Sequence, residues 1–506
     1  MRIKGWKAAS VWTFAWLLTA LCFGPATSEA KLRLKFGGQL ESSFFVGVEP
    51  NPADPSVAGL GKYYNFRNSN SLNLTLQPKI GRLQDKAELQ IRNLNFSRAT
   101  TTADLQNYNS MFPVSVRLNE AYIDFLDLTD WFDMRVGQQR IAWGTGVAFN
   151  PTDNINPFNL ENPLDFTARL PVPAIRMNFY IVPDTLTLTL VGVPVYTPAV
   201  LPISLFRAVA VSSIPLPFKE DDKTKIGNIK TVENLEQPAF DVSNTQAAAK
   251  LAGEFKVEND EGDTVWSINT SVSYYYGRLM IPTPNASKLT GLDLRVDKGL
   301  TYLDVDVTAN LIYPRVHVVG FDFSTSIGSV DFFGEFALFI PVEGVNMNID
   351  LGPVAGIAGA FIPGGKIDPV TTLDAEPYVK AVVGLEYTFP GGWFFNLQYV
   401  YGFFNEVTAS ALNHYAFLVM RKTFLRDKII LQVTLGGEMD FLTDAEQKKY
   451  GRAQSFAFLF NPELVFKPFD SGEIVLGGVI ARGQETTTLK IFEDLTQVYA
   501  RFRMKF

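Results

Sequence analysis

Residues 498–506 read VYARFRMKF, so the chain ends on an aromatic side chain. In an extended strand successive side chains point to opposite faces, which gives this segment one apolar and one polar face. Chain ends of soluble proteins normally fray into water, whereas a barrel between lipid and a wet lumen needs such a strand to close it. The segment therefore predicts the closing strand of a transmembrane β-barrel. Its apolar face carries Val498, Ala500, Phe502, Met504 and Phe506, and its polar face carries Tyr499, Arg501, Arg503 and Lys505.

The same period-two alternation recurs along the chain in units of about ten residues. In one unit, for example, Leu186, Leu188 and Leu190 alternate with threonines. We predict about 18 strands, with 16 as the alternative, because an even number returns both chain ends to one side of the membrane. The expected strands are 31–47, 72–80, 86–91, 120–125, one ending near 141, 175–181, 185–190, 250–257, 266–274, 315–327, 330–340, 377–389, 392–403, 412–424, 428–440, 453–466, 472–481 and 495–506.

The connections between these strands alternate between short and long. This is typical of bacterial barrels, which have short periplasmic turns and long extracellular loops. A soluble antiparallel sheet could show the strand alternation, but it would not combine it with one-sided turn lengths and the terminal strand. We therefore expect an all-β fold, with residues 31–506 forming a single antiparallel transmembrane β-barrel. Short turns are expected at 81–82, 183–184, 259–263, 328–329, 390–392 and 425–427, and long loops at 48–65, 97–115, 143–172, 194–246, 278–314 and 342–376.

The first thirty residues differ from the rest of the chain. Three basic residues precede an apolar segment at 8–23, and small residues at positions 28 and 30 suit cleavage after Ala30. The apolar segment is shorter than the roughly 20 residues of a membrane-spanning helix. We therefore expect residues 1–30 to be a signal peptide that is cleaved after export across the inner membrane.

The composition of the mature chain excludes several classes of function. The only cysteine, Cys22, lies in the expected signal peptide, so no disulfide, thiolate zinc site or thiol nucleophile is expected. The mature chain keeps 42 basic and 51 acidic residues, a net charge of −9, without a basic block. This charge argues against a nucleic-acid partner. No uncharged apolar stretch is long enough for a spanning helix, so any membrane crossing would be made by strands.

Residues 133–157 are the least strand-like stretch. Gly144 and Gly146 allow backbone conformations that other residues avoid, and Asn-Pro pairs at 150–151 and 156–157 stiffen the chain. A barrel of this size would otherwise enclose an open channel. We therefore expect the loop after Trp143 to fold inward as a pore constriction; the alternative is an outward surface loop. The pore-lining and constriction candidates are Glu120, Asp124, Arg135, Gln139, Arg140, Trp143, Asn150, Asp153 and Asn156.

Basic residues occur at both ends of the expected barrel. Because the first and last strands should pair, their basic runs are expected at the periplasmic end, where they form a basic rim. Such a rim could attract anionic solutes or anchor the barrel at lipid headgroups, and we favour anchoring. The rim residues are Arg33, Lys35, Arg501, Arg503 and Lys505.

A family resemblance lies in the same region. The segment RVGQQR at 135–140, Trp143-Gly144, the two Asn-Pro pairs and the strand NEAYIDF at 119–125 resemble proteobacterial outer-membrane β-barrels of unassigned function. The motifs are similar, more distantly, to alginate-export and substrate-selective porins. The resemblance implies a transport or structural barrel and names no cargo. It also implies that the barrel-assembly machinery recognises the terminal Phe506.

Enzymatic functions have little support in the sequence. His317 and His414 are the only histidines, and neither has a nearby serine for a Ser-His-acid hydrolase. A metal site made of these two histidines has equally little support, because they lie about a hundred residues apart in the sequence. No glycine-rich phosphate loop follows a strand and opens a helix. We expect no enzyme activity, no cofactor and no metal.

The sequence as a whole predicts a channel in the outer membrane of a Gram-negative bacterium. Small-molecule or polymer solutes would pass by diffusion or under the control of a partner. One alternative is an exporter barrel for hydrophobic or polymeric cargo that works with an inner-membrane pump. Another is a structural or electron-conduit sheath around a periplasmic partner. Outer-membrane lipid, lipopolysaccharide and the barrel-assembly machinery are the remaining expected partners.

Overall fold

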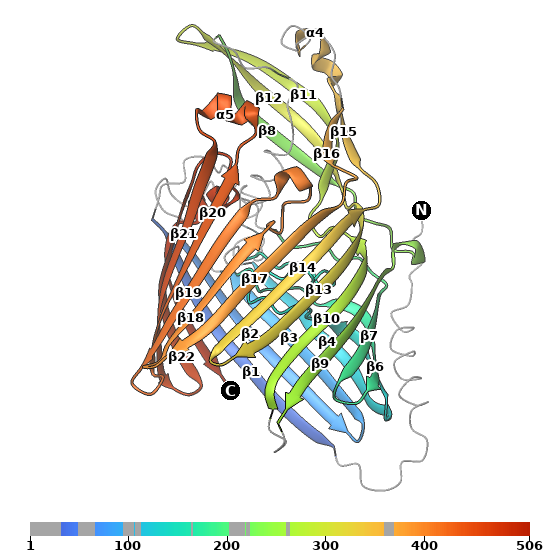
Figure 1. Cartoon of the computed structure of the whole chain (residues 1–506). Helices are drawn as coiled ribbons and strands as arrows, with labels where there is room; N and C mark the ends of the chain where they lie inside the picture. The colour runs from blue at the N-terminus through green and yellow to red at the C-terminus, as the bar shows by residue number, and fades with distance from the viewer. Residues whose placement is uncertain are drawn as a thin grey trace.

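The computed structural model describes residues 32–48, 66–94, 106, 113–162, 165–201, 218, 223–259, 264–358 and 369–506. Eighteen strands form one antiparallel sheet that closes on itself, because β1 pairs with both β2 and β23. The all-β barrel fold and its strand number, expected from the alternation, are confirmed (Figure 1). The barrel strands are β1 (Arg33–Gly47), β2 (Phe66–Ile80), β3 (Leu83–Leu94), β4 (Val114–Thr129), β5 (Phe132–Gln139), β6 (Val172–Val182), β7 (Leu186–Val193), β9 (Gln246–Glu258), β10 (Thr264–Arg278), β13 (Arg315–Ile327), β14 (Val330–Pro341), β17 (Tyr378–Phe389), β18 (Trp393–Tyr401), β19 (His414–Phe424), β20 (Ile429–Phe441), β21 (Gln454–Phe469), β22 (Gly472–Gly483) and β23 (Gln497–Lys505).

The seam between β1 and β23 closes the barrel. Their register runs from Gln39 opposite Lys505 to Gly47 opposite Gln497. The backbone of Phe506 continues the ladder, since the Gly38 N–H donates to the Phe506 carbonyl over 2.9 Å and the Phe506 N–H donates back over 3.0 Å. A side chain on Gly38 would overlap the Phe506 ring, so the glycine makes room for the terminal aromatic.

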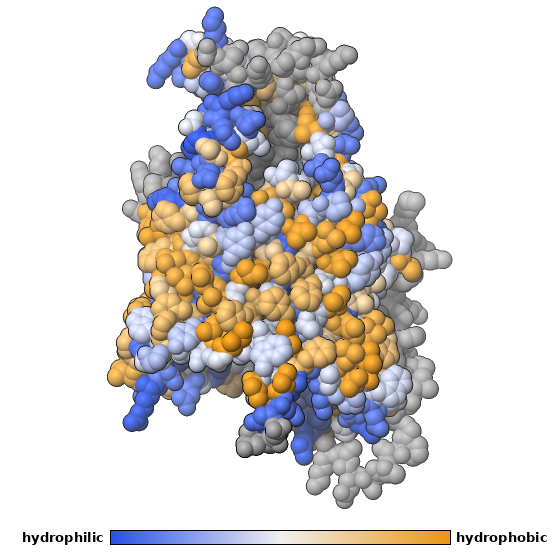
Figure 2. Space-filling model, viewed as in Figure 1, coloured by the Kyte–Doolittle hydropathy of each residue, from blue (hydrophilic) through white to orange (hydrophobic). Residues whose placement is uncertain are grey.

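The outer face of the barrel is apolar. Alternate residues such as Phe36, Leu397 and Phe502 expose large apolar side chains, which together we call the apolar belt. Figure 2 shows apolar side chains spread over the strands on the face in view. Trp131 and Trp393 lie at the short turns and are partly exposed on the same face. The belt matches the surface that faces hydrocarbon in a membrane barrel. No helix in the described ranges is long and apolar enough to cross a bilayer.

Short turns and long loops lie at opposite ends of the barrel. The turns after β2, β6, β13, β17 and β19 lie at the end that carries Phe506, which we call the short-turn end (Figure 1). Gly81 and Gly328 adopt positive φ in two of these turns, at 57° and 63°. The opposite end, the long-loop end, carries η3 (Val242–Asn244), η7 (Ala409–Ala411), α5 (Asp444–Tyr450) and η8 (Thr488–Leu495).

Three of the expected long loops build a second sheet. It has five strands in the order β16-β15-β11-β12-β8 and projects beyond the long-loop end (Figure 1). Leu289, Leu303, Val307 and Met347 lie in its own buried core. The sequence analysis treated these segments only as loops, and the structure corrects that description. The elements are β8 (Thr224–Leu235), β11 (Thr283–Asp297), β12 (Leu300–Ile312), β15 (Val345–Asp350), η4 (Gly352–Val354), α4 (Ala355–Ala358) and β16 (Val370–Leu373).

Candidate functional site: loops inside the barrel

The connection between β5 and β6, described over residues 140–162 and 165–171, folds into the barrel, and we call it the inward loop. Its main anchor is Glu335 of β14, which is fully buried on the inner wall. Four barrel strands separate β14 from β6, so the loop crosses part of the lumen to reach it. Glu335 accepts hydrogen bonds from the Thr145 N–H over 2.6 Å, the Gly146 N–H over 2.5 Å, the Thr152 hydroxyl over 2.8 Å, the Thr152 N–H over 3.3 Å and the Asn150 amide over 3.0 Å.

Gly144 is required where the inward loop meets this carboxylate. Its φ is 89°, a conformation that side-chain-bearing residues rarely adopt. A Cβ at this position would also overlap the Glu335 carboxylate. The glycine predicted to allow an unusual backbone conformation therefore adopts one, at the anchor of the loop.

The tip of the inward loop reaches the next strands of the inner wall. The Val147 N–H donates to the Gln398 side chain of β18 over 3.3 Å. The Phe149 ring stacks on Phe417 of β19, with ring centroids 4.6 Å apart. These contacts bury Phe149 and cover the inner face of β18 and β19.

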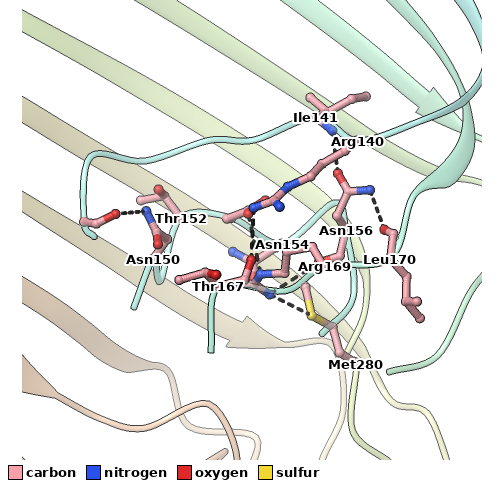
Figure 3. A network of polar contacts seen from close by, with 12 residues as sticks. Arg140, Ile141, Asn150, Thr152, Asn154, Asn156, Thr167, Arg169, Leu170 and Met280 are labelled. Atoms are coloured by element: carbon pink, nitrogen blue, oxygen red, sulfur yellow. Dashed lines mark hydrogen bonds and ion pairs between the residues drawn. The ribbon is translucent and has the colours of Figure 1, made fainter. Parts of the chain in front are cut away.

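Asn156 holds the base of the inward loop together (Figure 3). Its side-chain oxygen accepts from the Ile141 N–H over 2.7 Å, and its amide donates to the Leu170 carbonyl over 2.8 Å. The side chain is fully buried and joins the outgoing and returning halves of the loop. Asn156 is therefore an internal brace of the loop.

A buried ion pair lies beside this brace. The Arg169 guanidinium approaches Asp153, with Nε 3.7 Å from Oδ2, and lies 3.5 Å over the Phe158 ring centroid. Burial raises the pKa of the Asp153 carboxyl, and the charge of Arg169 opposes that shift. In Figure 3 the Arg169 side chain points towards Met280, beyond the end of β10.

A second segment, η8 between β22 and β23, also packs inward. Glu438 of β20 accepts from the Thr488 N–H over 2.7 Å and the Leu489 N–H over 2.6 Å. The Phe492 ring meets Phe166 of the inward loop edge-on, with centroids 5.6 Å apart. The sequence analysis did not assign this segment a role.

The polarity and burial of the inward-facing residues differ between the two sides of the barrel. On the β13–β19 side, inward residues such as Val318, Ala337, Val382 and Val400 are buried beneath the inward loop and η8. On the β1–β3 side the inward residues are polar and only half buried. These polar residues are Gln39, Glu41, Ser71, Asn73, Thr75, Lys86, Glu88, Gln90 and Arg92.

The charged site residues predicted on the strands all form ion pairs. Arg135 forms a bidentate ion pair with Asp124, in which Nε donates to Oδ1 over 2.5 Å and Nη2 donates to Oδ2 over 2.7 Å. Glu120 pairs with Lys86 and accepts from the Arg140 N–H over 3.1 Å. The Arg140 guanidinium remains exposed and donates to the Thr167 carbonyl over 3.1 Å.

The remaining predicted site residues are buried, except for Asn150, which is half-buried. Gln139 donates to the Ala174 carbonyl over 2.9 Å, at the β5–β6 junction. Trp143 packs in the lumen, with the Lys250 ammonium 6.0 Å from its ring centroid. Asn150 binds the loop carbonyl of Gly146 as well as Glu335. Among the predicted loop residues, Arg140 is therefore the one whose charged side chain is exposed.

The basic residues of the first and last strands are not opposite each other. Arg33 and Lys35 are exposed and pair in register with β2, because β1 extends beyond the C-terminus. Arg501 and Arg503 lie farther from the short-turn end than Arg33 and Lys35 do. Arg501 Nε is 3.8 Å and Arg503 Nε is 3.1 Å from the Glu41 carboxylate. Arg503 also pairs with Glu473. Lys505 is exposed opposite Gln39.

Both histidines face outward near the long-loop end of their strands. His317 Nδ1 is 2.7 Å from the Tyr274 hydroxyl, and His414 Nδ1 is 2.6 Å from the Tyr399 hydroxyl. Within the described residues, no group of three or more His, Cys, Asp or Glu side chains is placed to hold a metal ion.

No protein-family model and no curated protein sequence matches the chain. Solved structures of barrels do match it. OccAB1 of Acinetobacter baumannii matches with 8% sequence identity and a TM-score of 0.48, covering 93% of this chain and 95% of that one. A BenF-like porin from Pseudomonas fluorescens matches with 7% identity and a TM-score of 0.44, covering 94% and 98%. The outer-membrane channel DcaP of Acinetobacter baumannii matches with 11% identity and a TM-score of 0.37, covering 95% and 99%.

Proposed function

We propose that the protein is an outer-membrane channel in which the inward loop narrows a water-filled passage. The observation that carries this proposal is the anchoring of the loop on Glu335, several strands away from its own ends. A barrel with this number of strands would otherwise enclose a wide lumen. The loop and η8 cover one side of that lumen and leave the polar wall of β1–β3 beside the open space.

The residues along this passage favour small polar solutes. Charged side chains of both signs lie together there, including Lys86, Glu88 and Arg92. Glu161 of the inward loop reaches Arg92 at 2.6 Å and Arg117 at 3.4 Å, so a charged bridge borders the passage. Paired charges of both signs set up a local transverse field and no strong filter for one ion sign.

The apolar belt and the closing seam support insertion into the outer membrane through the barrel-assembly machinery. Outer-membrane lipid and lipopolysaccharide would then surround the outer face. An exporter for polymeric cargo or a sheath around a periplasmic partner would need the inward loop and η8 to move aside. The geometry therefore supports the solute channel best.

Single-channel recording in planar bilayers tests this function. The wild-type protein should conduct ions steadily, and Glu335→Gln should increase the conductance and its open-state noise. The glutamine amide has one acceptor oxygen and one NH₂ donor in place of the two carboxylate oxygens. The NH₂ group would face loop N–H and hydroxyl donors that the carboxylate binds in the wild type. Glu386→Gln is the matched control, because Glu386 lies on the inner wall of β17 and binds Asn396 instead of the loop.

A larger change should follow deletion of residues 144–158, which removes the tip of the inward loop. The conductance of the deletion variant should exceed that of Glu335→Gln. A wild-type protein that inserts as a heat-modifiable barrel yet never conducts would contradict the channel. Equal conductance of the wild type, Glu335→Gln and the deletion would contradict the constriction.

A further inference from the structure

Two arginines lie opposite each other at the long-loop end of the barrel wall. Arg278 ends β10, Arg315 begins β13, and the two residues are partners in the ladder. They share the outward face with Tyr276 and His317, since alternate residues of a strand lie on one face. The Arg315 guanidinium lies 5.3 Å from the centroid of the Tyr276 ring. Like charges directly opposite each other destabilise an antiparallel pair, so this position favours an added anion.

Within the described part of the chain, the hydrogen-bond acceptors of the two guanidinium groups are all neutral oxygens. Arg278 Nη2 and Arg315 Nη2 both donate to the Asn244 side-chain oxygen, over 2.6 and 3.1 Å, so the two cations converge on one atom. The other acceptors are the main-chain carbonyls of Tyr313 and Ser243. A guanidinium has five N–H donors, so each group keeps donors for a further partner.

Asp241 is the acidic residue of the segment that precedes this contact. Its carboxylate accepts from the Ser243 N–H over 2.8 Å and caps η3, and it forms no ion pair with either arginine. The hydrogen bonds from Ser243 and, more weakly, the charge of Arg315 lower the pKa of the Asp241 carboxyl, which is therefore ionised at neutral pH. Two arginines and one aspartate leave this group of residues with one net positive charge.

Exposed apolar side chains adjoin the two arginines. Phe240 is 82% exposed, and Val242, at the start of η3, is 89% exposed. Figure 1 shows η3 as a short green coil at the outer edge of the barrel, beside the long-loop ends of β9 and β10. Towards the short-turn end, Tyr274 and Val319 continue the outward face as part of the apolar belt. The two cations therefore lie at the border of the surface that faces hydrocarbon.

We propose that Arg278 and Arg315 together bind a phosphate group of lipopolysaccharide in the outer leaflet. Guanidinium groups bind phosphate oxygens through paired N–H donors, and long basic side chains at a membrane boundary reach the headgroup level. The acyl chains of the same lipid would cover Phe240 and Val242. Long loops of bacterial barrels are extracellular, so the two arginines would lie in the leaflet that carries lipopolysaccharide. The inference rests on the proposed insertion into the outer membrane and does not require conduction.

Lipid binding to the purified protein in a non-ionic detergent, measured by native mass spectrometry, tests this site. The probes are lipid A with both phosphates, the same lipid A without phosphates, and inorganic phosphate. The wild type should bind phosphorylated lipid A about tenfold more tightly than either of the other probes. The Arg278→Gln/Arg315→Gln variant should lose about tenfold or more of this affinity, because its hydrogen bonds to a charged group are lost. Its affinity for the lipid without phosphates should not change.

Arg33→Gln/Arg426→Gln is the control for loss of two arginines. Both residues are exposed at the short-turn end, so the affinity for lipid A should be unchanged. Asp241→Asn removes the one negative charge and keeps a side chain that caps η3, so it should tighten the binding of lipid A. Weaker binding by Asp241→Asn would contradict direct contact between the arginines and the phosphate.

Three further outcomes would overturn the proposal. They are equal affinity of the wild type for lipid A with and without phosphates, full affinity in the folded Arg278→Gln/Arg315→Gln variant, and inorganic phosphate that binds as tightly as lipid A. Heat-modifiable migration shows whether each variant is folded, and the comparison of the two lipids needs no variant. Absent lipid binding with intact conductance rejects this site alone, whereas lipid binding without conductance rejects the channel.

Discussion

Glu335 and Glu438 show how single carboxylates hold loops inside this barrel. The backbone N–H groups of an irregular loop need acceptors when the loop is buried. A carboxylate offers two oxygens with about four acceptor sites, and its hydrogen bonds are stronger than those between neutral groups. Glu335 binds Thr145 and Gly146 in this way, and Glu438 binds Thr488 and Leu489.

Gly144→Ala should release the inward loop at Glu335. The new Cβ would overlap the carboxylate, and alanine at a φ of 89° adds strain of about 1–3 kcal/mol. We expect noisier, larger single-channel currents than in the wild type. Gly192→Ala on β7 is the control, since a Cβ there meets nothing within 4 Å. Identical currents in both variants would show that the loop does not need this glycine.

Deletion of Phe506 should reduce barrel assembly. The deletion removes the two backbone hydrogen bonds to Gly38 and the ring that lies beside Phe36, with centroids 6.3 Å apart. We expect a smaller heat-modifiable fraction in the outer membrane. Phe424→Ala is the control, because Phe424 is an exposed aromatic at the short-turn end of β19, and β20, β21 and β22 separate it from β23. Unchanged assembly after deletion would rule out a role for the terminal residue.

The inward loop and η8 are two elements that share one interface. Phe166 of the loop packs edge-on against Phe492 of η8, and both rings are buried in the same apolar cluster. Contacting elements generally show non-additive effects when their anchors are removed. The loop and η8 should therefore behave as a coupled pair.

A double-mutant cycle measures this coupling. Glu335→Gln and Glu438→Gln should each raise the conductance, and the double variant should differ from the combination of the two single effects. Glu386→Gln paired with Glu438→Gln is the control, because Glu386 binds Asn396 and not the loop. Strict additivity for Glu335 and Glu438 would show that the two elements move independently.

The whole molecule divides into a barrel and a sheet with its own core. The barrel ladder passes directly from β10 to β13, with Arg278 opposite Arg315, and does not depend on the intervening hairpin. The hairpin of β11 and β12 packs its apolar side chains within the second sheet instead.

Replacing residues 283–312 by a short Gly-Asn linker should leave the barrel intact. We expect heat-modifiable migration and steady conductance to be retained, because the Leu279 N–H to Pro314 carbonyl bond, at 2.9 Å, still joins the strand ends. Replacing residues 330–341 by the same linker, which removes β14 from the barrel, is the disruptive control. Loss of the barrel after the hairpin replacement would show that the second sheet is needed for folding.

Much of the barrel could be predicted from the sequence because strand alternation is a local property. The pleat fixes a period of two, so Phe502 and Arg503 must face opposite sides whatever the rest of the chain does. The second sheet carried the same signal in β12, where Leu303, Val305 and Val307 alternate with aspartates and a threonine. That signal did not distinguish a strand of the barrel from a strand beyond its rim, because alternation identifies one buried face but not what covers it.

The sequence by itself determined the strand number, the outer face, the closing seam and the presence of an unusual loop after Trp143. Only the tertiary structure decided what the loop binds. Glu335 lies 190 residues from Thr145, so no local pattern links the two residues. Contacts between distant segments depend on closure and register of the whole barrel, which bring β14 within reach of the loop. A cavity lined by Phe149, Lys380 and Phe403 arises in the same way, since its lining is assembled from three connecting segments and five separate strands.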